Sequence, residues 1–167
     1  MQRAYQRLIT ACLLISSFIF LCGVDSCNPP DCTSVDRFLD NNDGTIADCR
    51  TDLVWLKDAN CYDTQNWNDT TDLTAGLSHG ECGLSDRSSA GDWKLPTKEE
   101  LQTIGTDPQS AWVKPGEPFV NVQGYFYWSS TEINTSSVWY LVMNNGNTNS
   151  ISKDGYNFCV WPVRSDN

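Results

Sequence analysis

The sequence predicts an α+β domain, built from two short helices packed on a mixed, mainly antiparallel sheet. Apolar residues recur at helical spacing in two stretches, within residues 66–77 and within residues 97–105. The last third of the chain alternates apolar and polar residues in short runs between turn residues, which is typical of antiparallel strands. The 167 residues suit one domain, in which the N- and C-terminal strands are expected to be adjacent.

The sharpest local signal is the stretch from Ala90 to Gly105, which reads AGDWKLPTKEELQTIG. Thr97 and Glu100 form a capping box: the Thr97 hydroxyl accepts from a free N–H at the helix start, and the Glu100 carboxylate reaches back. Gly105 is expected to end this helix in the left-handed conformation. The predicted core-facing residues of the stretch are Trp93, Leu95, Leu101 and Ile104.

The first 26 residues are typical of a secretory signal peptide, although an uncleaved anchor helix is the alternative. Arg3 and Arg7 supply a positive start, residues 8–24 form an uncharged apolar run, and Asp25 ends it. We therefore expect an extracytoplasmic protein (periplasmic, on the outer surface or secreted), with membrane anchoring, if any, through the N-terminus alone. Residues 27–35 are interpreted as a linker, and residues 36–165 as the folded domain.

Six cysteines follow the predicted signal peptide, and an even number in an exported chain predicts up to three disulfides. We expect Cys61–Cys82 across the first helical region and Cys49–Cys159 between the first and last strands. Cys27 then pairs with Cys32, unless Cys27 is lipidated and Cys32 is left odd. No two cysteines have the Cys-x-x-Cys spacing, so a redox or zinc site has little support.

The N-terminal half is expected to open with a hairpin around Asp40–Gly44, because its Asp-Gly pair suits a tight turn. The crowded acidic residues also suggest a calcium loop, but their spacing does not fit an EF-hand, and the turn is favoured. Leu53–Leu56 is a nearly continuous apolar run, typical of a strand buried on both faces. Asp63 or Thr64 is expected to cap the helix that follows. Its predicted apolar residues are Leu73, Ala75 and Leu77.

The C-terminal third is expected to be a sheet, with a hairpin turn at Asn144-Asn145-Gly146. Trp128, Trp139 and Trp161 are expected to pack together as cross-strand aromatics. The predicted strands are Tyr125–Ser130, Val138–Met143, Thr148–Ser152 and Phe158–Val163.

The same segment is rich in asparagine, with serine, threonine and tyrosine between. Such side chains supply adaptable hydrogen bonds and flat contact area, which is typical of binding surfaces and sugar sites. Ordinary loop and edge-strand polarity is the alternative interpretation. The candidate ligand-binding residues are Asn134, Tyr140, Asn144, Asn147, Asn149, Tyr156 and Asn157.

Charge and composition exclude several classes of function. The formal net charge is −10, which repels nucleic acid, sulfated glycans and anionic lipid, and favours neutral sugars, proteins or cations as partners. The one histidine, His79, lies in a Gly/Ser-rich stretch and is expected to be exposed. A single exposed histidine does not provide a catalytic triad or a histidine-ligated zinc site. We therefore expect no enzyme activity, no cofactor and no resident metal.

Several motifs together resemble the Lcl C-terminal domain family of bacteria. The strongest is GDWKLPTKEEL within residues 91–101; FLDNNDGT, TDLVWLKDANC, YWSST and VWPVR follow the family's order and extend the resemblance over residues 36–164. The resemblance implies a C-type-lectin-like fold, exported proteins and, for some members, adhesins that bind glycans. The tripeptide Trp67-Asn68-Asp69 matches a calcium-binding triplet of C-type lectins, but it lies in the first helical region rather than on a late strand.

These observations predict an exported, non-catalytic binding or adhesion domain with a neutral glycan or protein ligand. One alternative is a relative of the formylglycine-generating enzymes, which would need Cys159 as a reactive thiol. A second is a variable binding protein of the kind diversified by retroelements, and a third is a structural module without a small ligand.

Overall fold

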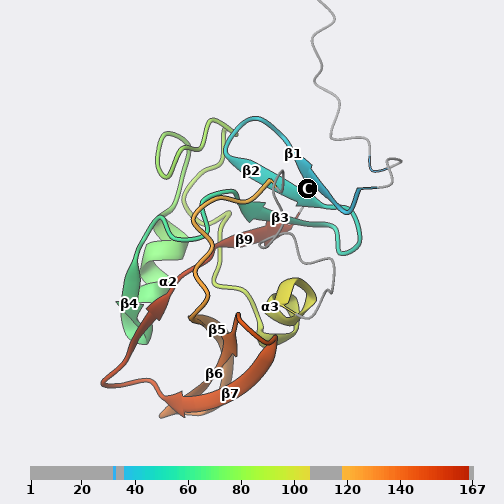
Figure 1. Ribbon diagram of the computed structural model, residues 1–167. Helices are drawn as coiled ribbons and strands as arrows, with labels where there is room; N and C mark the ends of the chain where they lie inside the picture. Colours follow the sequence, from blue (N-terminus) through green and yellow to red (C-terminus); the bar gives the residue numbers. More distant parts are fainter. Residues whose placement is uncertain (1–31, 33–35, 106–117, 166–167) are drawn as a thin grey trace, which may run out of the picture. The chain divides into compact units, whose positions relative to one another are not determined.

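A computed structural model describes residue 32 and residues 36–105 and 118–165. The predicted signal peptide at 1–26, the lipidation candidate Cys27 and all of the 27–35 linker except Cys32 lie outside these residues. Within them, no helix has both the length and the apolar character needed to cross a membrane. The α+β class is confirmed, but the strands form two sheets where the sequence predicted one (Figure 1).

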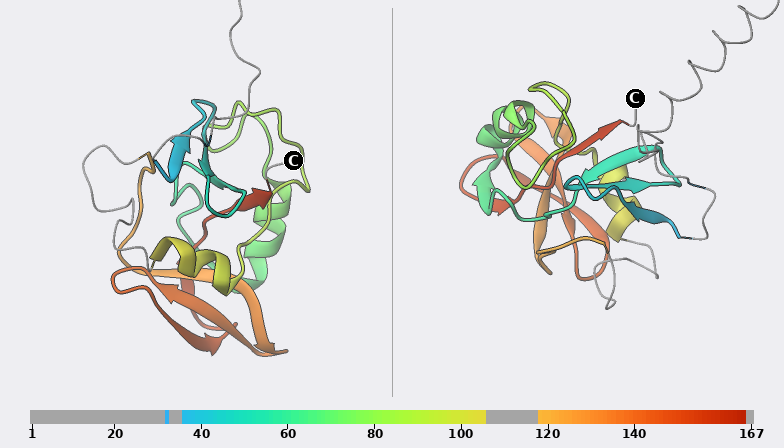
Figure 2. Two further views of the ribbon diagram at one scale, coloured as in Figure 1. Left: turned by 90° about the vertical axis from the view of Figure 1, so that its right-hand side faces the viewer. Right: turned by 90° about the horizontal axis from the view of Figure 1, so that it is seen from above.

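The first sheet is antiparallel throughout and has the strand order β1-β2-β3-β9 (Figure 2). The predicted hairpin joins its first two strands, and the buried run Leu53–Leu56 forms β3 in the middle of the sheet. The last strand of the chain pairs with β3, which places both ends of the domain in this sheet. The bounds are Phe38–Asp40 for β1, Thr45–Asp48 for β2, Leu53–Leu56 for β3 and Val163–Ser165 for β9.

The second sheet has the order β4-β8-β5-β6-β7, and its one parallel pair is β5 with β8. The predicted hairpin turn at residues 144–146 joins β6 to β7, and Gly146 takes the positive φ of 69° that such a turn requires. The bounds are Thr64–Asn66 for β4, Phe126–Asn134 for β5, Ser137–Val142 for β6, Asn147–Ser152 for β7 and Asn157–Cys159 for β8.

Helix α3 (Lys98–Gly105) has the predicted capping box and packs on β5, β6 and β7. The Glu100 N–H donates to Thr97 Oγ1 at 3.1 Å, and the Thr97 N–H donates to Glu100 Oε2 at 2.7 Å. Gly105 does not adopt the predicted left-handed conformation and stays within the helix. It is small for another reason: a Cβ there would lie 2.9 Å from Leu141 Cδ2, so glycine permits close packing of α3 on β6.

Helix α2 (Trp67–Gly76) begins later than predicted, because residues 64–66 form strand β4. Asn66 therefore caps it instead of Asp63 or Thr64, accepting from the Asp69 N–H at 3.2 Å. Its buried helical positions are Thr70 and Thr74, while Leu77 is buried just after its end. The predicted apolar face is thus wrong in part, because Leu73 is half-buried and Ala75 is exposed.

The three tryptophans expected to pack together lie in three different surroundings. Trp161 is fully buried in the larger core cluster, and Trp128 belongs to a second, smaller cluster. Trp128 pairs with Tyr140, so the side chain of Trp139 points to the opposite face, where the Lys98 ammonium lies 4.5 Å from its ring. The prediction of a three-tryptophan cluster is therefore wrong.

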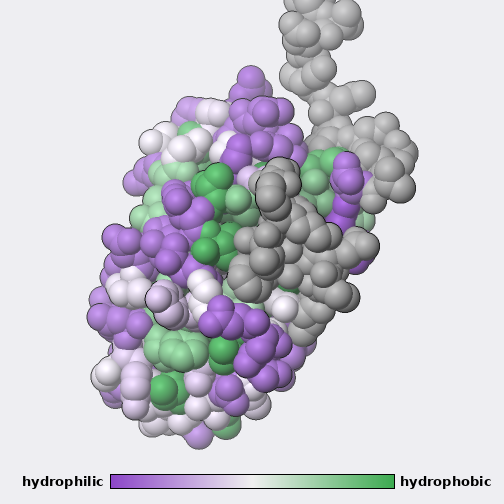
Figure 3. Space-filling view, viewed as in Figure 1, coloured by the Kyte–Doolittle hydropathy of each residue, from purple (hydrophilic) through white to green (hydrophobic). Residues whose placement is uncertain are grey.

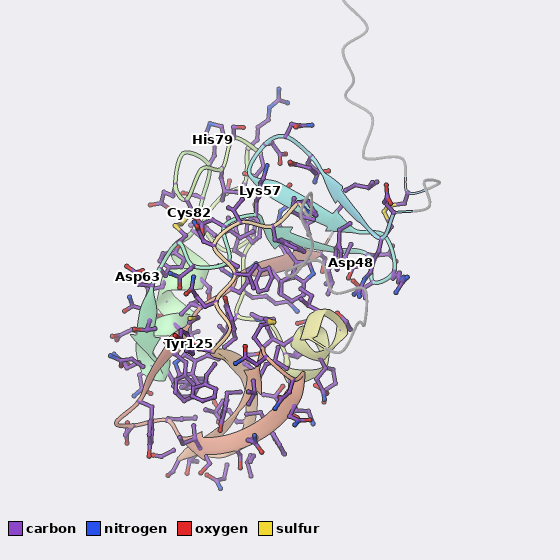
Figure 4. The ribbon with its side chains drawn as sticks, viewed as in Figure 1. Asp48, Lys57, Asp63, His79, Cys82 and Tyr125 are labelled. Carbon is purple, nitrogen blue, oxygen red and sulfur yellow. A yellow bond between two sulfur atoms is a disulfide. The ribbon has the colours of Figure 1, made fainter. Side chains whose placement is uncertain are left out.

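Two disulfides join the described cysteines. Cys61–Cys82 is confirmed, with Cα atoms 5.7 Å apart, and it ties the segment before β4 to the loop after α2 (Figure 4). The predicted Cys49–Cys159 bond is wrong, as is Cys27–Cys32, because Cys49 pairs with Cys32. The last strand that joins the first sheet is β9, whereas Cys159 lies on β8 in the other sheet and is a buried free thiol.

Candidate functional site

The second sheet presents one half-open face that combines aromatic rings with side-chain amides. Strand register places Phe126 opposite Val142 and Trp128 opposite Tyr140, so these four side chains point to the same face. Asn147 and Asn149 join that face, because they pair with Val142 and Tyr140 in turn. We call the patch formed by Phe126, Tyr140, Asn147, Asn149, Tyr156 and Phe158 the aromatic–amide face.

Phe158 on β8 lies at the centre of the rings. Its centroid lies 5.0 Å from the rings of both Phe126 and Tyr140, and 6.1 Å from that of Tyr156. Beneath it, Trp128 is stacked at 4.2 Å with its Nε1–H bonded to the Gln65 carbonyl at 2.8 Å. A fully buried, hydrogen-bonded tryptophan therefore supports Phe158, the ring that contacts the other three.

The outer rings and the two amides are accessible to a ligand. Phe126 is 39% exposed and Tyr156 is 46% exposed, while Asn147 and Asn149 are also exposed. Figure 3 shows apolar residues at the surface among polar ones where β5 to β7 lie. All six members of the aromatic–amide face are uncharged, so a ligand meets aromatic surface and hydrogen-bonding groups without a formal charge.

Trp67, on the first turn of α2, packs against the cluster of Trp128 and Phe158 beneath this face. The Trp67 indole Nε1–H donates to the Ser129 carbonyl at 2.9 Å. The Lys153 ammonium lies 4.0 Å from the Trp67 ring and 2.9 Å from Glu132 Oε1. Trp67 is thus a packing residue on the first turn of α2, which is consistent with assigning no sugar-binding role to Trp67-Asn68-Asp69.

Four of the seven residues predicted to bind ligand lie together: Tyr140, Asn147, Asn149 and Tyr156. Asn134 is at the far end of β5, beyond two register shifts and opposite Ser137, and its Oδ1 accepts from the Ser136 N–H. Asn157 points away from Phe158, because neighbours on a strand face opposite sides. Asn144 is exposed in the β6–β7 turn, beside Gly124.

Sequence reasoning missed two members of the face: Phe126, which is an accessible ring, and Phe158, which is the central one. Both fell within predicted strands, and neither was assigned a site role. The two-residue spacing of Phe126 and Trp128 indicates a shared face, but Phe126 is 39% exposed whereas Trp128 is fully buried. That difference follows from tertiary packing, and local sequence carries no signal for it.

Two hollows lie elsewhere on the surface. The larger, with a volume of about 460 Å³, is formed by Tyr62, Leu73 and Gly76 and by the acidic residues Asp69, Asp72 and Glu81. Burial raises the pKa of Tyr62, and the nearby Glu81 carboxylate raises it further. The smaller, of about 370 Å³, lies beside the β1–β2 turn and includes Lys57, Asp58 and Cys82. Neither contains a predicted ligand-binding residue.

The β1–β2 turn uses its carboxylates internally. Asp43 Oδ1 accepts from both the N–H and the hydroxyl of Thr45, at 3.0 and 2.6 Å, and Asp40 forms an ion pair with Lys57 at 2.5 Å. These contacts favour the turn interpretation over the calcium loop. Across the described residues, no group of three or more His, Cys, Asp or Glu side chains is arranged to hold a metal ion.

The residues considered for catalysis lie apart from the aromatic–amide face or are inaccessible. His79 is exposed in the loop after α2, and its Nδ1 accepts from the Arg87 N–H at 3.2 Å (Figure 4). Cys159 is 2% exposed, and burial raises the pKa of its thiol to about 11. At neutral pH this cysteine is therefore held as a neutral, enclosed thiol.

Fold and site together define a disulfide-supported α+β domain with an exposed aromatic–amide face. The model of the Lcl C-terminal domain family matches residues 44–164, and the chain belongs to that family. No curated protein matches the chain.

Proposed function

We propose that this protein is an exported, non-catalytic binding domain that holds a neutral glycan on the aromatic–amide face. The accessible aromatic rings flanked by two carboxamides carry the proposal. Aromatic faces carry partial negative charge, which favours contact with the polarised C–H groups of a sugar ring, while amides match its hydroxyls. The absence of formal charge from the six face residues suits an uncharged ligand.

Two further observations support this assignment. The chain's net charge of −10 disfavours sulfated or otherwise anionic glycans. The two disulfides are consistent with an extracytoplasmic location, where glycans and surface proteins are accessible. A protein ligand remains compatible with the same face, because tyrosine and asparagine are also frequent in protein-binding surfaces.

The purified, oxidised protein should be screened on an array of neutral and sulfated glycans, with and without calcium, together with a panel of cell-surface proteins. We expect the protein to bind neutral glycans without calcium and to bind sulfated glycans more weakly. A hit on proteins with a blank glycan array would contradict the ligand class. A blank result on both panels would contradict the proposed function and favour the structural module.

The alternative enzyme would require a reactive cysteine, and Cys159 is the free cysteine of the described residues. We expect a thiol reagent to leave Cys159 unmodified in the native protein at pH 7 and to modify it after unfolding, because the thiol is buried and protonated. Mass spectrometry of labelled peptides measures this directly. Rapid native labelling of Cys159 would contradict the non-catalytic proposal.

The same burial predicts a pH effect on stability. The pKa of Cys159 is raised above its ordinary value of 9.0 to about 11, so the folded state holds a proton that the unfolded chain releases. This contribution is complete below pH 9 and is lost as the pH rises to about 11. Cys159→Ala should accordingly lose less stability than the parent protein over that interval, as measured by urea unfolding.

A further inference from the structure

We propose that strand β7 is a homotypic interaction edge, through which two copies of this chain join their five-stranded sheets. β7 is the outermost strand of the order β4-β8-β5-β6-β7 (Figure 1). It pairs with β6 over six residues without a register shift. Among the described residues, β6 is its one strand partner, and no described strand pairs with its outer edge.

This edge lacks the features by which proteins usually prevent strand pairing. Natural edge strands are shortened, bulged or supplied with charge or proline. β7 has six residues, NTNSIS, with none of these features. The other three edges contrast with it: β1 contains Asp40, β9 contains Arg164, and β4 is three residues long and leads directly into α2.

The charge distribution favours a second copy as the partner. With a net charge of −10, two copies repel one another through most of their surface, yet residues 144–152 are uncharged. A two-fold axis perpendicular to the sheet pairs residues of the same face, so antiparallel pairing of β7 with itself about Ser150 places Ser150 opposite Ser150 and Asn149 opposite Ile151. Residues 148–152 are uncharged, and the same segment of both copies forms the contact, as a two-fold interface requires.

Such pairing has a structural consequence that does not depend on the ligand proposed above. A two-fold axis perpendicular to the sheet leaves equivalent faces of the two copies on the same side. Because Asn147 and Asn149 belong to β7, two aromatic–amide faces would lie next to each other on one ten-stranded sheet. The contact is a single strand pair, well below the usual interface of about 1,600 Å², so we expect weak association, with a Kd on the order of 100 μM.

Sedimentation velocity of the purified, oxidised protein over a range from about 10 μM to 1 mM tests the proposal, because this range brackets the expected Kd. We expect the weight-average mass to rise from that of a monomer toward that of a dimer. Ser150→Lys, which brings two positive charges together at the centre of the contact and faces away from the aromatic–amide face, should keep the protein monomeric. Ser89→Lys, at an exposed loop serine, adds the same charge and should associate as the parent does.

Hydrogen exchange of the unmodified protein provides a second readout that needs no variant. We expect the outward-facing β7 amides to exchange more slowly at 1 mM than at 10 μM, while the edge amides of β1 remain unchanged. A protein that stays monomeric at 1 mM with concentration-independent exchange in β7 overturns the proposal. Association that Ser150→Lys leaves intact while that variant remains folded overturns it as well.

Discussion

Replacing Trp161 with alanine is expected to reduce the free energy of unfolding by about 3–5 kcal/mol, the range for large aromatic residues removed from cores. Trp161 is fully buried and its Nε1–H donates to the Leu56 carbonyl of β3 at 2.8 Å. Its ring also contacts Trp55 at 5.5 Å, Phe119 at 5.0 Å and Tyr127 at 5.6 Å. One side chain therefore links both sheets and the segment that precedes β5.

Urea unfolding followed by tryptophan fluorescence and circular dichroism measures this loss. Trp139→Ala is the matched control, because Trp139 is half-buried and its described ring contact is the Lys98 ammonium. Trp139→Ala should reduce the free energy of unfolding markedly less than Trp161→Ala does. Equal losses in the two variants would show that the packing around Trp161 does not dominate the core. Since domains of this size are stable by about 5–15 kcal/mol, Trp161→Ala is expected to remove a large fraction of the total stability.

Asp48→Ala should produce a loss of similar size for an electrostatic reason. The Asp48 carboxylate is 0% exposed and accepts from Arg37 Nε at 2.8 Å and from Arg37 Nη2 at 2.6 Å. The Arg37 guanidinium also donates to the Thr103 carbonyl of α3 at 2.7 Å. Removing the carboxylate takes both of these acceptors from a buried guanidinium, and breaking a buried ion pair by removing one partner typically costs about 3–5 kcal/mol.

The control for this prediction is Asp72→Ala, which removes an exposed aspartate from α2. Its unfolding free energy should lie within about 0.5 kcal/mol of the parent value. Both variants can be compared by urea unfolding at pH 7 and at two ionic strengths, because a buried pair is screened little by salt. A loss below 1 kcal/mol in Asp48→Ala would contradict the view that Arg37 and Asp48 fasten the first sheet to α3.

The features that local sequence predicted correctly are those whose physical cause lies within a few residues. The Thr97–Glu100 capping box and the turns at Gly44 and Gly146 depend on side chains and backbone angles close in the chain. Cys61–Cys82 was also predicted correctly, although its cysteines are 21 residues apart, because it closes the one segment that contains α2.

The errors arose where long-range pairing decides the outcome. Assuming one sheet made Cys159 seem adjacent to Cys49, whereas the strand beside β3 is β9, and the chain reaches it only after leaving β8. Gly105 is explained by contact with Leu141 on β6, which no helix-ending rule includes. For the candidate site, the asparagine-rich composition identified Asn147 and Asn149, but strand register was needed to separate them from Asn134.

The most direct test of the aromatic–amide face compares binding by the parent protein with binding by Asn147→Ala/Asn149→Ala/Tyr156→Ala, using the neutral glycan that gives the strongest array signal. These three side chains are exposed, so their removal should leave folding intact, whereas Tyr140→Ala would uncover Phe158. Asp69→Ala/Asp72→Ala/Glu81→Ala, in the acidic hollow, is the control. We expect the face variant to lose at least about tenfold in affinity, equivalent to about 1.4 kcal/mol, and the control to bind as the parent does. Undiminished binding by the folded face variant would contradict the account.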